Sequence, residues 1–213
     1  MLLDHSNRIL GLEMEWMKLL GRSAYPLFAF ILVYNYIYHT RNALHYLSRL
    51  LILGVVSQGP YALAFPSASI GNSANIMFSL GASLFAIIYL EYIQEHAGKF
   101  DIRFKWLHGY IYMLMIAYFG FVVSYMYFGL FMTFCFYFLI RYPSHQILKL
   151  VGFSVLILNF PGGIEQMGAS VLSLLLISLV LQTDIKIKRI NKHLFYFFYP
   201  AHLILLLSLA TIF

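Results

Sequence analysis

The stretch Gly21–Asn42, GRSAYPLFAFILVYNYIYHTRN, decides the fold class. Its central run, Ala24–Tyr38, is apolar nearly all round, whereas a helix on the surface of a soluble protein has one apolar and one polar face. Arg22 precedes this run, and His39 and Arg41 follow it. We therefore interpret the run as a membrane-spanning helix with basic groups at both ends.

The composition extends this interpretation to the whole chain. Of its 213 residues, 62% are hydrophobic and 10% are charged, whereas soluble domains are roughly 45–50% apolar and about 25% charged. So few charges cannot cover a soluble surface. We predict one integral membrane domain over residues 1–213, with an all-α fold: a polytopic transmembrane helical bundle. The single cysteine, Cys135, lies inside an apolar run, so the sequence indicates neither a disulfide nor a metal site.

About eight apolar runs are predicted to cross the membrane after a partial N-terminal helix. Several are shorter than the roughly 20 residues that cross about 30 Å of hydrocarbon. The segment Met1–Leu20 carries six charged or titratable side chains, and we expect it to be too polar to span. The eight runs are Ala24–Tyr38, Tyr46–Phe65, Asn75–Ile93, Trp106–Val122, Met126–Ile140, Ile147–Phe160, Gly168–Leu181 and Phe195–Phe213.

The basic residues separate between alternate connections. The net charge is +6, and one set of connections holds most of the Lys and Arg, whereas Pro66–Ala74, the break near Ser124 and Pro161–Met167 hold none. The positive-inside rule places the first set in the cytoplasm and explains the charge without nucleic acid. Arg8, Lys18 and Arg22 depart from this pattern. Either a site within the bundle or a missing upstream helix would explain them.

Some ionisable residues lie within the predicted spans. A charge in lipid costs about 2.5–3.5 kcal/mol on insertion scales, so such residues usually face a bundle interior or a cavity. Arg49 and His202 are the clearest cases. Tyr199 lies three residues before His202 and shares its helix face, and both a packed helix interface and a functional site explain this pair. Glu91 lies near a helix end, where reaching out to the interface is the simpler explanation.

Two further polar groups interrupt apolar runs. Asn75, Ser79 and Ser83 form a stripe at four-residue spacing, which more often joins helices than lines a cavity, although Asn75 remains a cavity candidate. The segment Ser57–Pro60, SQGP, contains Gln58 and interrupts the second run. We expect a kink there beside a polar interior.

Acid–base and anion-binding candidates flank the first span. His5 titrates near neutral pH and is the best base, but its neighbour Asp4 does not share its helix face, so a relay between them is not implied. Guanidinium groups match phosphate and carboxylate geometry, which makes Arg22, Arg41 and Arg49 candidates. Arg41 is also explained as a topological charge, and Arg22 as a snorkelling residue. Because Arg22 lies beside the Asp4–His5 segment, on the face whose later connections hold no Lys or Arg, the charge pattern favours it as catalytic.

Several short motifs occur in order along the chain. They are Asp4-His5, Glu15–Met17, Gly21–Phe30, His39–Arg41, Tyr46–Leu50, Ser57-Gln58, Asn75–Phe78 and Phe198–Leu203. Together they resemble the TraX family of integral membrane pilin acetylases from conjugative transfer systems, which is distantly related to membrane acyltransferase-3 proteins. In that family a hydrophobic helix leads into the Asp-His pair, whereas here Met1 lies three residues before Asp4. We therefore expect the first helix to be truncated or missing.

The resemblance implies a membrane-bound N-acetyltransferase of the bacterial inner membrane. It would transfer an acetyl group from acetyl-CoA, the co-substrate, to the N-terminal amine of a pilin subunit, with no metal. Membrane lipid would be the other partner. The residues assigned on this basis are His5, Asp4, Arg22 and His202 for catalysis, Arg41, Arg49 and His39 for acetyl-CoA, and Asn75, Gln58 and Tyr199 as other cavity residues.

Two other classes of function fit the same sequence. An acyltransferase that modifies a cell-surface glycan or lipid would use the same basic, histidine-containing interior. A non-enzymatic membrane factor for pilus assembly would need only the helices. A transporter is less favoured, because the sequence shows no inverted repeat with paired broken helices.

Overall fold

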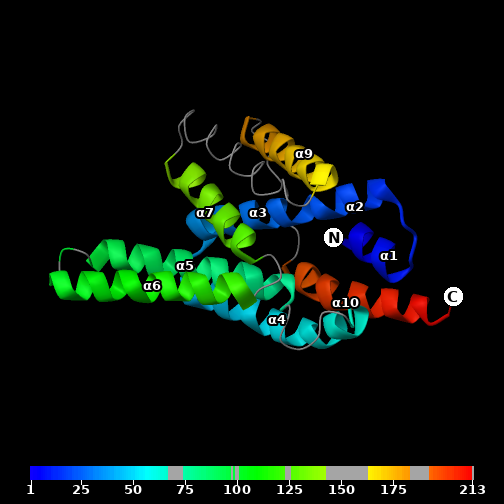
Figure 1. Cartoon of the computed structure of the whole chain (residues 1–213), viewed down its shortest axis with the longest axis horizontal. Coiled ribbons are helices and arrows are strands. Elements are labelled where there is room, and N and C mark those ends of the chain that lie inside the picture. The colour runs from blue at the N-terminus through cyan, green and yellow to red at the C-terminus, as the bar shows by residue number, and fades with distance from the viewer. Residues whose placement is uncertain are drawn as a thin grey trace.

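The computed structural model describes residues 1–66, 74–96, 98, 101–122, 126–142, 163–182 and 192–212. The predicted run Ile147–Phe160, most of the loop Pro66–Ala74 and the break near Ser124 lie outside these residues. Within them the fold is an all-helical bundle, as predicted (Figure 1). Its helices are α1 (Leu2–Ile9), α2 (Glu15–Arg22), α3 (Ala24–His39), α4 (Ala43–Ala64), α5 (Ile76–His96), α6 (Ile102–Val122), α7 (Met126–Arg141), α9 (Gly163–Gln182) and α10 (Lys192–Ala210).

Each predicted span that falls in the described part of the chain coincides with one helix. Three of the helical segments there are long and apolar enough to cross a membrane, namely Glu15–His39, Ala43–Ala64 and Ile76–His96. The apolar helices Gly129–Arg141, Gly168–Leu181 and Phe197–Ala210 are shorter. Exposed apolar side chains follow the outer face of α4, where Val55, Val56 and Leu63 are 66%, 58% and 71% exposed. A lipid-facing surface explains this exposure.

The first span begins earlier than predicted. The expectation that all of Met1–Leu20 is too polar to cross is wrong for its second half, because α2 continues almost directly into α3 and the two form the segment Glu15–His39. Two of the three charges of α2 lie in its first half, where Lys18 Nζ pairs with Glu15 Oε1 at 2.6 Å. A pair at the end of a span remains near the polar interface. The predicted partial N-terminal helix is the short α1.

The α4 helix contains the whole polar segment Ser57–Pro60. It continues through Ser57–Pro60 to Ala64 without ending, although Pro60 cannot donate a backbone hydrogen bond. Its polar side chain Gln58 contacts the neighbouring helix: Gln58 Oε1 accepts hydrogen bonds from the backbone and side-chain amides of Asn75, directly before α5. The expected polar contact beside this segment is therefore present.

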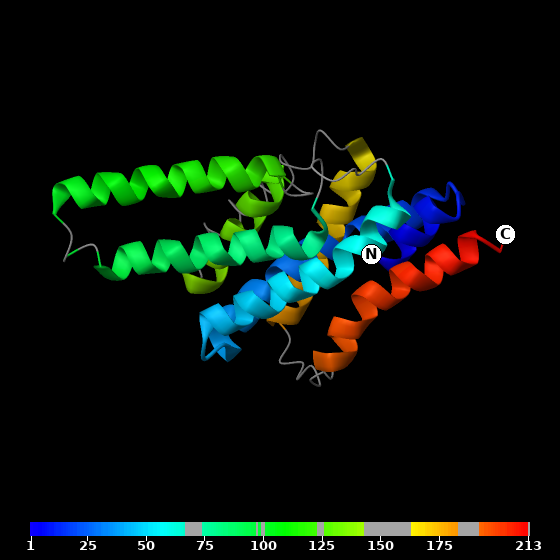
Figure 2. The same ribbon diagram turned by 90° about the horizontal axis from the view of Figure 1, so that it is seen from below.

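The packing order explains where a site can form. Helices α5 and α6 form a long hairpin that extends away from the rest of the bundle in both views (Figures 1 and 2). The core lies where α3, α5 and α7 meet, and Val33, Leu84, Ile87 and Phe136 are each fully buried there. The short α1 packs between α2 and α10, so the two ends of the chain lie together.

Candidate functional site

Two buried histidines meet where α1 packs against α10. His5 Nδ1 lies 3.0 Å from His202 Nε2, although 197 residues separate the two in sequence. The rings are nearly parallel, with an interplanar angle of 6° and centroids 5.2 Å apart, which is the arrangement of two imidazoles joined edge to edge by a hydrogen bond. Only 8% of His5 and 4% of His202 are exposed. The predicted site residues His5 and His202 therefore belong to one cluster.

A backbone carbonyl sets the direction of this hydrogen bond. His202 Nδ1 lies 2.9 Å from the carbonyl oxygen of Phe198, which can only accept. A neutral His202 therefore carries its proton on Nδ1, and its Nε2 accepts from the Nδ1–H of His5. It follows that Nε2 of His5 has no proton and presents a lone pair. This tautomer of His5 is a base.

The surroundings keep His5 neutral. Its ring packs edge to face with Phe65, with ring centroids 5.2 Å apart, and the Arg8 guanidinium lies 4.7 Å from the centre of the same Phe65 ring. Burial lowers the pKa of His5, and the charges of His202, the amino terminus and Arg8 lower it further. Since α1 is too short to cross a bilayer, this pair lies where a short helix meets a longer one. His5 is therefore an uncharged base in a site with little water.

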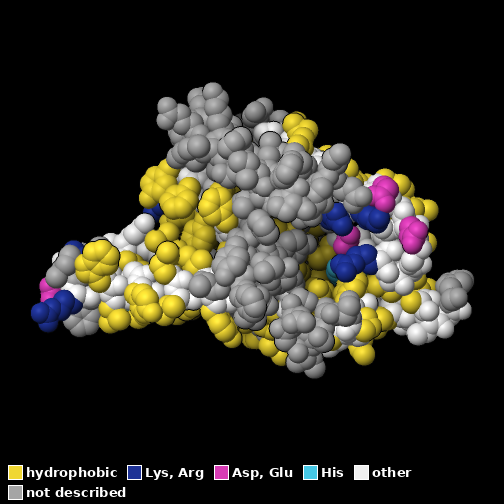
Figure 3. Space-filling model, viewed as in Figure 1, with side chains coloured by type: hydrophobic (Ala, Val, Ile, Leu, Met, Phe, Trp, Pro, Cys, Tyr) yellow, Lys and Arg dark blue, Asp and Glu magenta, His cyan; other side chains and the backbone are white. Residues whose placement is uncertain are grey.

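Asp4, the sequence neighbour of His5, lies on the α2 side of α1. Asp4 packs against Gly21, where an added Cβ would lie 2.3 Å from the Asp4 Cβ, and the Met1 amine donates to the Gly21 carbonyl at 3.1 Å. Arg22 follows Gly21 and ends α2, half-buried. Asp4 thus faces α2 while His5 faces α10, in agreement with the expectation that adjacent helical residues do not form a relay. Basic and acidic side chains are intermixed over this part of the surface (Figure 3).

Asn75 and Gln58 form a helix joint instead of an open cavity. Asn75 is fully buried, and its side-chain amide donates to the Gly54 carbonyl at 2.8 Å and to Gln58 Oε1 at 2.9 Å. Its Oδ1 accepts from the Met77 amide at 3.0 Å. These bonds use both the donor and the acceptor of the Asn75 side chain. They fit the favoured prediction that Asn75 joins two helices. Tyr199, 2% exposed, lies beside His202 with ring centroids 5.5 Å apart.

The predicted acetyl-CoA residues lie elsewhere. His39, Arg41 and Arg49 are all exposed, and the expectation that Arg49 faces the interior is wrong. Its position on α4 points outward because Leu47 and Leu50 occupy the buried face. Gly21 and Arg41 are twenty residues apart at opposite ends of α3, which corresponds to about 30 Å along a helix. The structure does not bring these three residues to the histidine pair.

Comparison with known proteins identifies the family. The model of the TraX protein family matches residues 1–210, which is nearly the whole chain. The chain belongs to the TraX family. It is 36% identical over 92 residues to Protein TraX of Escherichia coli and 37% identical over the same length to that of strain K12, covering 43% of this chain and 36% of each relative.

A third relative of this TraX-family chain carries a different name. It is the probable fimbrial assembly protein FimC, serogroup H1, of Dichelobacter nodosus, which is 32% identical over 100 residues, 41% of each chain. The chain thus matches about two-fifths or less of the length of these curated relatives. No solved structure matches the chain.

Three side chains that the sequence prediction did not place in any site also form a cluster in this TraX-family chain. The Tyr36 hydroxyl donates to Glu91 Oε2, and the Tyr137 hydroxyl donates to Glu91 Oε1 at 2.7 Å. Glu91 lies toward the end of α5, as expected, but these two tyrosines hold its carboxylate, so it does not simply reach out to the interface. A glutamate two residues before the end of the predicted run Asn75–Ile93, with tyrosines in neighbouring spans, was the signal in the sequence. Among the described residues, no group of three or more His, Cys, Asp or Glu side chains is placed to hold a metal.

Proposed function

We propose that this TraX-family chain is a membrane-bound acetyltransferase that transfers the acetyl group of acetyl-CoA to the N-terminal amine of a pilin subunit at the inner membrane. The observation that supports this best is the buried His5–His202 pair, which leaves Nε2 of His5 free of a proton. Family membership and the fimbrial assembly name of one relative support a role with pilin.

The proposed reaction needs one base and one place for negative charge. The amine nitrogen attacks the thioester carbon, a C–N bond forms, and the C–S bond breaks as the coenzyme A thiolate leaves. His5 Nε2 takes the proton of the amine and passes it to the thiolate. Of the three predicted oxyanion donors, Asn75 is occupied and Nε2 of His202 accepts from His5, so Tyr199 is the one we assign.

The arginines take two different parts in this proposal. Arg8 shares the Phe65 ring with His5, and Arg22 ends the neighbouring α2. We assign both to the anionic donor near the reacting group. His39, Arg41 and Arg49 lie on the predicted cytoplasmic side, where we assign Arg41 and Arg49 to attraction of the donor from solution. Asp4 holds α1 against α2 and thereby positions His5.

The test is the intact mass of a pilin subunit coexpressed with the protein. The wild type should add the mass of one acetyl group, and His5→Ala should abolish the addition at equal protein level. His45→Ala is the matched control, because His45 is an exposed histidine at the start of α4. Full acetylation by His5→Ala would refute the proposed base.

The same experiment separates the other two classes of function. Unmodified pilin together with His5-dependent acetate on a surface glycan or lipid would indicate a different acceptor. Unmodified pilin, with labelled acetyl-CoA neither bound nor consumed by purified protein, would indicate an assembly factor without enzymatic activity.

A further inference from the structure

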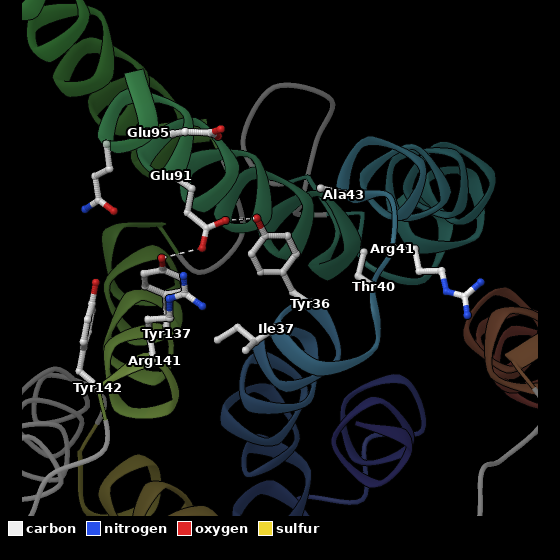
Figure 4. Close-up of a pocket in the computed structure, with 11 residues that line it drawn as sticks. Tyr36, Ile37, Thr40, Arg41, Ala43, Glu91, Glu95, Tyr137, Arg141 and Tyr142 are labelled. Carbon is white, nitrogen blue, oxygen red and sulfur yellow. Dashed lines mark hydrogen bonds between the residues drawn. The ribbon is translucent and has the colours of Figure 1, made fainter. Parts of the chain in front are cut away.

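A second polar site lies at the opposite end of the bundle from the histidine pair. The ends of α3, α5 and α7 enclose a cavity of about 540 Å³. Its wall contains two cations, Arg41 and Arg141, and two carboxylates, Glu91 and Glu95 (Figure 4). A volume of this size is within the range of small-molecule sites, roughly 300–1,000 Å³.

Glu91 is fixed in this cavity as a hydrogen-bond acceptor. The hydroxyls of Tyr36 on α3 and Tyr137 on α7 donate to its two carboxylate oxygens, one to each. Tyr137 is only 1% exposed, whereas Glu91 is half-buried, so the carboxylate is fixed while it still lines the cavity. In Figure 4 the side chain of Arg141 lies beside Tyr137, whereas that of Arg41 points away from Glu91. Arg141 is therefore the cation that faces the same space as Glu91.

The cavity is separate from the histidine pair. Val33 lies one turn before Tyr36 on α3, Ile87 lies one turn before Glu91 on α5, and Phe136 precedes Tyr137 on α7. All three are fully buried in the core. This packed layer lies between the cavity and the other end of α3, so a molecule in the cavity does not reach His5 through it.

The position and surroundings of the cavity are those of a membrane interface. It is formed by the helix ends that the charge pattern places on the cytoplasmic side. Next to it, α7 presents the exposed rings of Phe138 and Tyr142, which are 40% and 51% exposed. Pockets between membrane helices on this side can hold lipid head groups, and the wall of this one carries charges of both signs.

We propose that this cavity binds the head group of a zwitterionic phospholipid that carries a primary ammonium. Arg141 contacts the phosphate with a charge-assisted pair of hydrogen bonds, and Glu95 contacts the ammonium. The acyl chains lie along the exposed rings of α7. A purely anionic head group fits less well, because it would meet the charges of Glu91 and Glu95 without a cation of its own.

The test measures lipid retention on the purified full chain by native mass spectrometry in detergent, with phosphatidylethanolamine and phosphatidylglycerol supplied in equal amounts. We expect the wild type to retain phosphatidylethanolamine in preference. Arg141→Gln should lower its retention about tenfold, which corresponds to the loss of one charged contact. Glu95→Gln should remove the preference between the two lipids.

Arg103→Gln is the matched control, because Arg103 is an exposed arginine at the start of α6 that does not line the cavity. Its lipid retention should equal that of the wild type, and thermal unfolding followed by circular dichroism shows that each variant is folded. Equal retention by Arg141→Gln, or a preference for phosphatidylglycerol, would overturn the proposal. So would displacement of the lipid by acetyl-CoA, since the cavity would then be a nucleotide site. None of these readouts needs acetyl transfer, so failure of the pilin assay is a separate result.

Discussion

His5 and His202 bring the first and last helices of the chain into one hydrogen bond, 3.0 Å between Nδ1 and Nε2. His5 is the donor in this bond because the Phe198 carbonyl accepts from Nδ1–H of His202, which leaves Nε2 of His202 as an acceptor. One backbone oxygen thus determines which nitrogen of His5 is free. His202 is in this sense a positioning residue for His5.

The first prediction concerns this positioning role. His202→Leu removes the acceptor for the Nδ1–H of His5 and should lower the acetylation rate toward the roughly 10²–10⁴-fold loss expected for removal of a general base. His202→Gln keeps a side-chain carbonyl that can accept, so it should retain more activity than the leucine variant. The measurement is the initial rate of pilin labelling from radiolabelled acetyl-CoA in membranes. Equal rates for the two variants would show that the acceptor does not matter.

The second prediction concerns pH and stability. Burial lowers the pKa of His5 from its usual 6.5, so below pH 6.5 the unfolded chain binds a proton that the folded chain does not. The free energy of unfolding should therefore fall as the pH decreases below 6.5, and should not depend on His5 above that value. Thermal unfolding in detergent between pH 5 and 8 measures this slope. His5→Gln should have a smaller slope in the acid range, and an unchanged slope would count against a neutral buried His5.

The sequence predicted the helices better than the site. Apolar runs specify helices locally, so each described helix was predicted to within a few residues. The exception was α2, where the charges of Glu15 and Lys18 masked a span because their pairing at its end was not visible. The residues of the histidine pair were singled out, but their contact was not, since it depends on how α1 and α10 pack.

Other assignments depended on side-chain direction. Arg49 and Glu91 both lie within predicted spans, and the sequence alone placed the wrong one in the interior. Arg49 faces outward, and Glu91 turns to Tyr36 and Tyr137. Helical periodicity was of little help, because these helices are apolar nearly all round and do not mark an inner face.

The third prediction concerns the contact between α1 and α2. Gly21→Ala would place a Cβ 2.6 Å from the Asp4 amide nitrogen and 2.8 Å from its Cα, so the backbone of α1 must move. We expect loss of acetylation and a lower melting temperature. Gly109→Ala on α6 is the control, because nothing lies within 4 Å of its added Cβ. That change should be neutral or stabilising by up to about 1 kcal/mol. Wild-type activity of Gly21→Ala would argue against a fixed position of α1.

The fourth prediction separates structural from catalytic roles for Asn75. Asn75→Ala leaves Gln58 and the Gly54 carbonyl without their buried partner, which should lower the free energy of unfolding by about 1–3 kcal/mol. Chemical denaturation in detergent measures this loss. The acetylation rate for each folded molecule should remain within a small factor of the wild type. A folded Asn75→Ala protein without activity would instead indicate that Asn75 stabilises the oxyanion.

The last prediction concerns the joint that Glu91 makes between α3, α5 and α7. Tyr36→Phe and Tyr137→Phe each remove one donor to its carboxylate, and each should lower the free energy of unfolding by about 1.5–3 kcal/mol, the range for hydrogen bonds to a charged group. The double variant should lose more free energy of unfolding than the sum of the two single variants. With both donors removed, no hydrogen bond offsets the desolvation of the half-buried carboxylate. In a Glu91→Gln background this coupling should shrink, since the charge is absent. Tyr38→Phe, which alters a tyrosine that is 58% exposed on the same helix, should leave the stability unchanged. Strict additivity of the two tyrosine substitutions would show that Glu91 finds another donor, and the three helices would then not depend on one shared carboxylate.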